Sequence, residues 1–126
     1  MIFGTLAVTD GQKTINPDWS NLEGSILVSS GHWFTEEGLA FQEEFQETFG
    51  YQPGAAAAYA YDGINVIIGV IKRAGVDRDR IIEAFAEANH KSGITGDIQF
   101  DVNGNRSGCS SLMTIRKGNP YILAGD

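Results

Sequence analysis

The sequence lacks several features that would identify particular functions. It has one cysteine, Cys109, which excludes an internal disulfide and any metal site built from cysteines. No His lies near Cys109 in the sequence, so we interpret it as a small apolar filler rather than a nucleophile. No run of 18 apolar residues occurs, which argues against a transmembrane helix and direct membrane insertion. Glycine-rich phosphate-binding motifs are also absent.

Positive charge is scarce. Nine Lys and Arg residues against sixteen Asp and Glu give a net charge of −7, which argues against a nucleic-acid partner. Glu43, Glu44 and Glu47 form the main acidic cluster. Acid–base catalysis needs a neighbouring group that separates the pKa values of two acids, and no such group is visible, so a solvated helix face is the better interpretation. We therefore predict no enzymatic activity, no metal and no cofactor.

The N-terminus carries no recognisable targeting signal. Residues 1–5 (MIFGT) have neither a basic region nor a following apolar region of the kind that begins a signal peptide. Taken alone, this feature predicts a cytoplasmic protein.

What is present fits one α/β domain. The chain has 126 residues, 42% of them apolar, and sixteen glycines that predict frequent turns. The expected order is two strands, three helices and three strands. The strand signals fall at residues 2–8, at 25–30 (short and apolar enough to be buried on both sides), around Ile98 and Phe100, at 112–116 and at 121–123.

Three helices are expected between the strands. Thr35 is an N-cap candidate for a helix to Phe49, and Gly50 follows as a C-terminal glycine. Asp77 is an N-cap candidate for a helix from Arg78 to Asn89. Residues 55–74 give the strongest helical signal, with an apolar stripe that consists of Ala60, Ile64, Ile67, Ile68 and Ile71 and is widened by Val66 and Val70.

The stripe on residues 55–74 needs a cover. Gly63 and Gly69 lower helix propensity and would allow a neighbouring backbone to approach closely. Because no cover is evident in the sequence, we expect marginal stability or self-association.

Residues 92–106 are interpreted as the end of the third helix, a short strand and a turn. Ile98 and Phe100 alternate with polar residues, and Asn103-Gly104 favours a tight turn because both residues tolerate a positive φ.

Five segments in this order resemble a known family: 22–28 (LEGSILV), 41–45 (FQEEF), 49–53 (FGYQP), 58–63 (AYAYDG) and 93–106 (GITGDIQFDVNGNR). Together they resemble the C-terminal third of the leucine/isoleucine/valine-type substrate-binding proteins of ABC importers. The resemblance implies an α/β chain with a partial type I periplasmic-binding-protein fold, which contains portions of both lobes and the hinge crossings.

The resemblance implies that residues 1–30 supply strands of the C-terminal lobe and a hinge. It places residues 35–105 in the N-terminal lobe and makes 110–123 the final crossing strands. The first part of the N-terminal lobe and most of the C-terminal lobe have no counterpart here. A fragment, a two-chain protein and a misplaced start all remain open.

The resemblance further implies a function. The expected ligand is an amino acid or a related small polar molecule, bound between two lobes that close by a hinge motion. The expected partner of the full-length protein is an ABC importer permease, and its expected location is periplasmic or extracellular. A ligand-sensing domain of a receptor or regulator with the same fold is the alternative.

Two residues are candidates for ligand binding. Asp10 matches a cleft-facing loop of the family in which an acidic residue meets the ligand ammonium, although Asp10-Gly11 is a standard turn pair and the residues themselves favour a turn role. Trp33 could line the cleft, since pockets are mostly apolar or aromatic, or could pack between lobes. His32 beside it lacks the partners of a metal or catalytic site.

The remaining candidates are structural. Tyr59 is expected to be buried, and Asp62 is expected to accept hydrogen bonds near the helix start. The hinge is expected at Ser29, Ser30 and Gly31.

Overall fold

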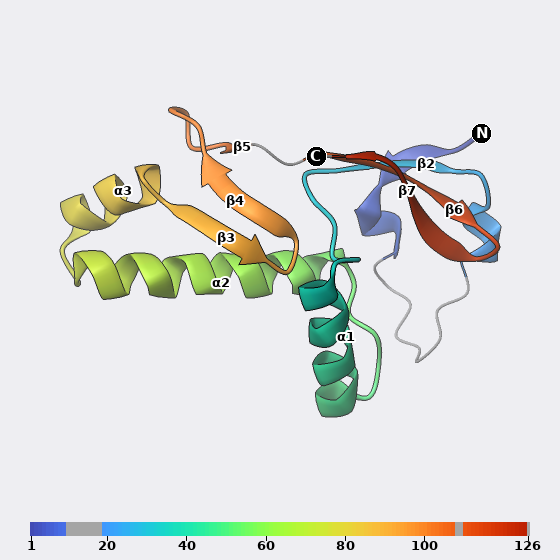
Figure 1. The fold of residues 1–126 in the computed structure, drawn as a ribbon, viewed down its shortest axis with the longest axis horizontal. Coiled ribbons are helices and arrows are strands. Elements are labelled where there is room, and N and C mark those ends of the chain that lie inside the picture. The colour runs from blue at the N-terminus through green and yellow to red at the C-terminus, as the bar shows by residue number, and fades with distance from the viewer. Residues whose placement is uncertain (10–18, 108–109, 126) are drawn as a thin grey trace.

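The computed structural model describes residues 1–9, 19–107 and 110–125, and its elements form two parts (Figure 1). One part holds a four-stranded sheet, and the other holds two helices and a three-stranded sheet. The first part contains β1 (Phe3–Thr5), the short 3-10 helices Leu6–Thr9 and Ser20–Leu22, β2 (Ile26–Ser29), β6 (Ser111–Arg116) and β7 (Asn119–Gly125). The second contains α2 (Ala55–Ala74), α3 (Arg78–Ala86), β3 (Asn89–Gly93), β4 (Gly96–Phe100) and β5 (Arg106–Ser107).

The larger sheet has the strand order β1-β2-β6-β7. β1 runs parallel to β2, and the other neighbours are antiparallel, with Leu27 opposite Met113. Both of these side chains are fully buried, together with Ile115 of β6. Their core also includes Trp33 and residues at the start of α2. The first turns of α2 therefore pack against the larger sheet.

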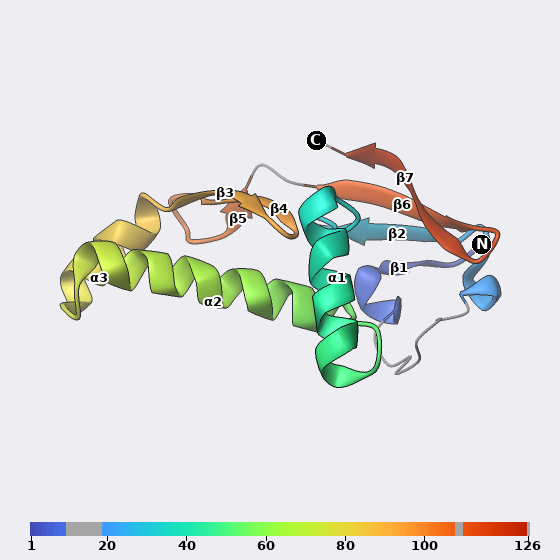
Figure 2. The same ribbon diagram turned by 60° about the horizontal axis from the view of Figure 1, so that its bottom comes forward.

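The smaller sheet is antiparallel, in the order β3-β4-β5. Ile98 of β4 is buried against Val66 and Val70 of α2 and Ala84 of α3. The two views show α2 running from the larger sheet along the length of this second part (Figures 1 and 2). One helix thus contributes to both cores.

Helix α1 (Glu36–Phe49) begins and ends where its capping residues predict. The side chain of Thr35 accepts a hydrogen bond from the backbone N–H of Gly38 at 3.1 Å. Gly50 adopts the left-handed conformation, with φ 78°, that closes the helix. The prediction for this helix is confirmed at both ends.

The prediction for α2 is also confirmed at both ends, and the helix has two unlike faces. Ala58, Asp62, Val66 and Val70 are buried. Val66 and Val70 therefore do not widen the predicted apolar stripe, which lies on the other side of the helix. The exposed fractions of the isoleucines in that stripe lie between 39% and 55%. The stripe exists, but it is open to solvent.

The two N-terminal strand predictions need correction. Residues 2–8 do not form a buried strand: β1 has three residues, Phe3 is 73% exposed, and the buried Leu6 already belongs to a 3-10 helix. β2 is not buried on both sides either, since Leu27 is buried whereas Val28 is 53% exposed. The core that contains Leu6, Trp33 and the start of α2 covers one face of β2, and the alternation of side chains leaves the other face open.

The third helix ends earlier than predicted, and a strand follows it. α3 begins at its predicted N-cap, where Asp77 accepts from the N–H of Arg80, but it stops at Ala86. Residues 89–93 (NHKSG) then pair with β4. Their polar sequence carries no strand pattern, so this strand depends on its pairing with β4 rather than on propensity.

The turn on Asn103-Gly104 is confirmed. The N–H of Gly104 donates to the carbonyl of Asp101 at 2.9 Å, and Gly104 has φ 81°. The Asp101 carboxylate accepts from the backbone N–H groups of Asn105 at 2.8 Å and Asn103 at 2.9 Å. These bonds, first that from the Asn105 N–H, lower the pKa of Asp101 below its usual value.

The expected role of the glycines in α2 is wrong. A Cβ placed on Gly63 or Gly69 would meet no atom within 4 Å among the described residues, so no neighbouring backbone requires either glycine. Gly38 of α1 is the helical glycine with such a neighbour. Its Cβ would lie 2.2 Å from the carbonyl oxygen of Trp33.

The different surroundings of Gly69 and Gly38 predict that substitution by alanine has opposite effects at the two positions. Gly69→Ala should stabilise the protein by about 0.5–1 kcal/mol, because alanine loses less backbone entropy in a helix. Gly38→Ala should destabilise it by about 1–3 kcal/mol, because the added methyl overlaps the Trp33 carbonyl. Urea unfolding followed by circular dichroism measures both. Equal effects of the two substitutions would contradict this assignment.

Candidate functional site

The buried carboxylate of Asp62 attaches the turn between β3 and β4 to α2. Asp62 is 2% exposed and lies on the buried face of α2. Its carboxylate accepts from the backbone N–H of Ile94 at 2.9 Å, from the N–H of Thr95 at 2.8 Å and from the Thr95 hydroxyl at 2.5 Å. A buried carboxylate needs such partners, so the turn between β3 and β4 is fixed to α2.

Arg106 completes this cluster from the start of β5. Its guanidinium donates to the Thr95 hydroxyl and to the Thr95 carbonyl, both at 2.9 Å, and to the carbonyl of Asp97 at 3.0 Å. The Thr95 hydroxyl thus accepts from Arg106 while it donates to Asp62. A negative and a positive side chain are connected through one hydroxyl group.

The segment that follows β2 contacts the same cluster at Gly31. This glycine has φ 129°, and a Cβ on it would lie 2.3 Å from the Thr95 carbonyl oxygen and 3.1 Å from the Arg106 guanidinium. Only glycine fits such a conformation and such a close approach. The Tyr59 hydroxyl donates to the Gly31 carbonyl at 3.3 Å and also forms a short hydrogen bond with the Ser29 hydroxyl. The end of β2 is therefore held against α2.

A cavity of about 350 Å³ lies beside this attachment. The larger sheet and its first 3-10 helix form one wall, and the start of α2 forms the other. Its lining residues are Thr5, Leu6, Ala7, Val28, Ser29, Ser30, Ala55, Ala56 and Tyr59. The side chains of Thr5, Ser29, Ser30 and Tyr59 therefore place hydroxyl groups on an otherwise apolar lining. The N-terminal end of α2 adds the partial positive charge of a helix dipole, and its N-cap residue, Gly54, has no side chain to cap it.

The predicted site residues fall in three different places. Ser29 and Ser30 line the cavity, and Gly31 lies next to it along the chain. Trp33 is 1% exposed within the main core and is absent from the described lining of this cavity. Asp10 lies outside the described residues. The ligand contacts of Asp10 and Trp33 and the hinge role of Ser29, Ser30 and Gly31 remain predictions.

Two residues of the cluster, Thr95 and Arg106, were not predicted from the sequence. Asp62 was expected to be structural, but with hydrogen bonds near its own helix start, whereas its partners lie more than 30 residues further along the chain. One signal in the sequence was available. Asp62 lies four residues before Val66 and eight before Val70, so an ionisable residue occupies the buried side of α2.

His32 is half-buried near the end of β2. Burial lowers the pKa of His32 below its usual value of 6.5, because the charged ring loses solvation. Its Nδ1 accepts a hydrogen bond from the backbone N–H of Phe34 at 3.2 Å, and its ring stacks on the Phe34 ring with centroids 6.2 Å apart. Only the ring with an unprotonated Nδ1 can accept this bond.

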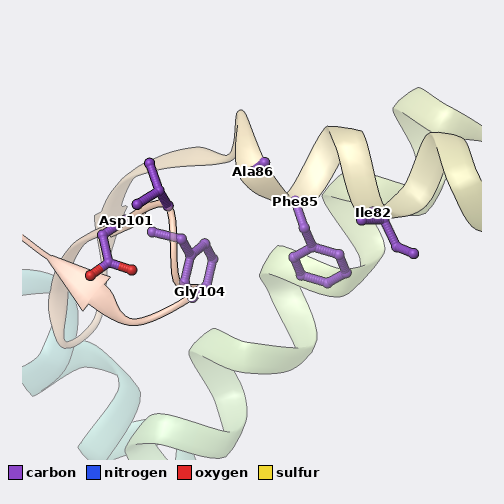
Figure 3. A pocket seen from close by; sticks show the side chains of 7 residues that line it. Ile82, Phe85, Ala86, Asp101 and Gly104 are labelled. Carbon is purple, nitrogen blue, oxygen red and sulfur yellow. The ribbon is translucent and has the colours of Figure 1, made fainter.

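Another cavity, of about 540 Å³, lies between α3 and the turn after β4 (Figure 3). Ile82, Phe85 and Ala86 come from α3, and Asp101 and Gly104 come from the turn. Its walls are mostly apolar and belong to the second part alone. It therefore lacks the position between the two parts that distinguishes the cavity at Ser29 and Ser30.

Among the described residues, no three His, Cys, Asp or Glu side chains gather closely enough to hold a metal ion. None of the helices described combines the length and apolar character needed to cross a membrane.

Solved structures match this arrangement. A leucine-binding protein from Thermotoga maritima is 26% identical with a TM-score of 0.68, over 85% of this chain and 32% of its own. An ABC-transporter solute-binding protein from Rhodopseudomonas palustris BisB5, in complex with 3,4-dihydroxybenzoic acid, has a TM-score of 0.77 at 20% identity. The match covers 98% of this chain and 36% of that protein. A leucine-, isoleucine-, valine-, threonine- and alanine-binding protein from Brucella ovis has a TM-score of 0.74 at 14% identity. The match covers 99% of this chain and 36% of that protein. No protein-family model and no curated protein matches.

The chain thus has a partial type I periplasmic-binding fold, and it spans about a third of the length of these structures. Several of the matched structures are leucine- or branched-chain-amino-acid-binding proteins, and others are solute-binding proteins of ABC transporters, as the sequence resemblance predicted. Those neighbours are solute-binding proteins rather than enzymes.

The Asp62 cluster generates a stability prediction. Asp62→Asn should lower the free energy of unfolding by about 2–3 kcal/mol, because the amide cannot accept all three hydrogen bonds and leaves a buried donor unpaired. Urea unfolding measures the change. Asp77→Asn is the matched control and should change stability little, since asparagine is an equally good N-cap at that exposed position. A loss for Asp62→Asn no larger than that of the control would contradict the assigned role.

His32 generates a pH prediction. Its folded pKa is lowered, so between that pKa and 6.5 the unfolded chain binds more protons than the folded chain. Its contribution to stability should therefore be complete above pH 6.5 and decrease as the pH falls toward the folded pKa. An NMR titration of the His32 ring should give a midpoint below 6.5. A midpoint at or above 6.5 would show that burial does not disfavour the charged ring.

Proposed function

We propose that this chain forms part of the solute-binding component of an ABC importer, with its ligand bound between two lobes. The cavity at the end of β2 carries this proposal, because it lies between the larger sheet and α2. The fold likeness to solute-binding proteins supports it. On this basis the partner of the whole protein is an importer permease, and its location is periplasmic or extracellular.

The proposal assigns the two parts to two lobes. Residues 1–30 supply strands of the C-terminal lobe and the hinge, residues 35–105 belong to the N-terminal lobe, and residues 110–123 are the final crossing strands. Ser29, Ser30 and Gly31 form the hinge. The fixed contacts of Gly31 with Thr95 and Arg106 support this assignment, because a hinge needs a defined point about which the parts turn.

The ligand class we propose is a small carboxylate with an apolar body, such as a branched-chain amino acid. Neighbouring structures are described as complexes with leucine, isoleucine, benzoate and 3,4-dihydroxybenzoic acid, all of which share this chemistry. In this chain the hydroxyls of Ser29, Ser30 and Tyr59 and the positive end of α2 suit a carboxylate. The surrounding apolar lining suits the rest of the molecule.

An NMR titration tests the proposal. Addition of L-leucine or sodium benzoate to the chain of residues 1–126 should shift the backbone amide signals of Ser29, Ser30 and Ala55. The neutral compound benzamide should shift them less, because it lacks the charge that the end of α2 favours. Ser30→Ala should weaken binding about three- to tenfold through the loss of one hydrogen bond.

Thr48→Ala is the matched control. It removes a hydroxyl from a different groove, between α1 and α2, and should leave the affinity unchanged. The proposal fails if neither compound shifts the three amide signals at millimolar concentration. It also fails if the largest shifts occur at Thr48 or Ile82, which line other cavities.

A further inference from the structure

The Tyr59 side chain connects three features of the molecule. It comes from the first turns of α2 and lines the cavity beside β2. Its hydroxyl donates to the Gly31 carbonyl at 3.3 Å and forms a second hydrogen bond with the Ser29 hydroxyl. Its ring lies edge-on to the buried ring of Trp33, with centroids 6.4 Å apart. One side chain therefore contacts the cavity, the segment of the proposed hinge and the main core.

The direction of these two hydrogen bonds follows from the number of protons. A hydroxyl group has one proton and two lone pairs. Because the Tyr59 proton is donated to the Gly31 carbonyl, the bond between the two hydroxyls uses the Ser29 proton, and the Tyr59 oxygen accepts it. The hydrogen bonds thus run from Ser29 to Tyr59 and from Tyr59 to Gly31. Both protons are engaged within the protein.

A ligand carboxylate can take one of these protons more easily than the other. Ser29 lines the cavity, and its hydroxyl turns toward a ligand by rotation about one side-chain bond. The Tyr59 proton, in contrast, would have to leave the carbonyl of Gly31, a buried residue, without this donor. A charged carboxylate is also a stronger acceptor than a neutral phenol oxygen. The Ser29 proton is therefore the one that a carboxylate takes.

We propose that Tyr59 is a positioning residue that couples ligand binding to the hinge, a role that rests on the proposed function of the cavity. Its hydrogen bond with Ser29 holds the end of β2 against α2. A carboxylate ligand takes the Ser29 proton and breaks this bond, whereas the bond from Tyr59 to Gly31 remains and keeps the pivot in place. The end of β2 then changes its angle to α2 about Gly31. The bond between Ser29 and Tyr59 thus favours the arrangement that the ligand has to leave.

Tyr59→Phe tests this role, because it keeps the ring beside Trp33 and removes the hydroxyl. The ligand then no longer competes with Tyr59 for the Ser29 proton, and the bond to Gly31 is lost with and without ligand alike. The affinity of the chain of residues 1–126 for L-leucine or sodium benzoate, measured by NMR titration, should therefore rise about two- to tenfold. Tyr61→Phe is the matched control. Its hydroxyl belongs to the same helix, but Tyr61 is 46% exposed and packs on Phe41, so its loss should leave the affinity unchanged.

The methyl signals of Leu27 distinguish this coupling from a purely structural role. Leu27 is fully buried in the core that the larger sheet shares with the start of α2, and it is absent from the described lining of the cavity. Its signals should move when the ligand changes the angle of β2 to α2. In Tyr59→Phe without ligand, they should already lie partway toward their positions in the ligand-bound original chain. A hydroxyl that only stabilised the fold would not displace them along that line.

A second variant removes the same hydrogen bond from its other end. Ser29→Ala deletes both the bond to Tyr59 and the proton that the ligand takes, so it should weaken binding less than Ser30→Ala does. Circular dichroism of each variant checks that the helices still form.

The outcomes separate this role from the proposed function. If the original chain binds and Tyr59→Phe binds more weakly, the hydroxyl contacts the ligand directly. If the affinity of Tyr59→Phe is unchanged, the hydroxyl does not couple ligand to hinge. Either result, or a loss for Ser29→Ala as large as that for Ser30→Ala, overturns the role of Tyr59 and leaves the proposed function standing. An original chain that binds neither compound refutes the proposed function and this role with it.

Discussion

The buried carboxylate of Asp62 fixes the turn between β3 and β4 on α2, and the segment that leaves the larger sheet at Gly31 packs against that turn. A charge removed from water must be compensated by hydrogen bonds, and here three donors from the turn between β3 and β4 provide them. That turn can therefore occupy one position on α2. Because Arg106 binds the same turn, the start of β5 is fixed as well, and the segment that leads toward β6 begins from a defined point.

Gly31 connects this constraint to the larger sheet. Its backbone passes so close to the Thr95 carbonyl and the Arg106 side chain that no Cβ fits, and Tyr59 of α2 binds the same segment through its hydroxyl group. Gly31 and Arg106 are thus both attached to α2, Gly31 through the Tyr59 hydroxyl and Arg106 through Thr95 and Asp62. In the hinge that we propose, these contacts would hold the crossing segments together while the two parts change their angle. The cavity at Ser29 and Ser30 lies beside that point, so the angle between the parts would alter its shape.

Local chemistry explains which parts of this structure the sequence predicts. The limits of α1 and α2 follow from Thr35, Gly50 and Gly75, residues that act on their immediate neighbours. β3 was missed because its polar residues become a strand only through pairing with β4. The partners of Asp62 were missed for the same reason, since they lie far along the chain. The cavity itself was not predicted: Ser29 and Ser30 were expected at the hinge, and the contribution of Thr5 and Tyr59 depends on packing between separate elements.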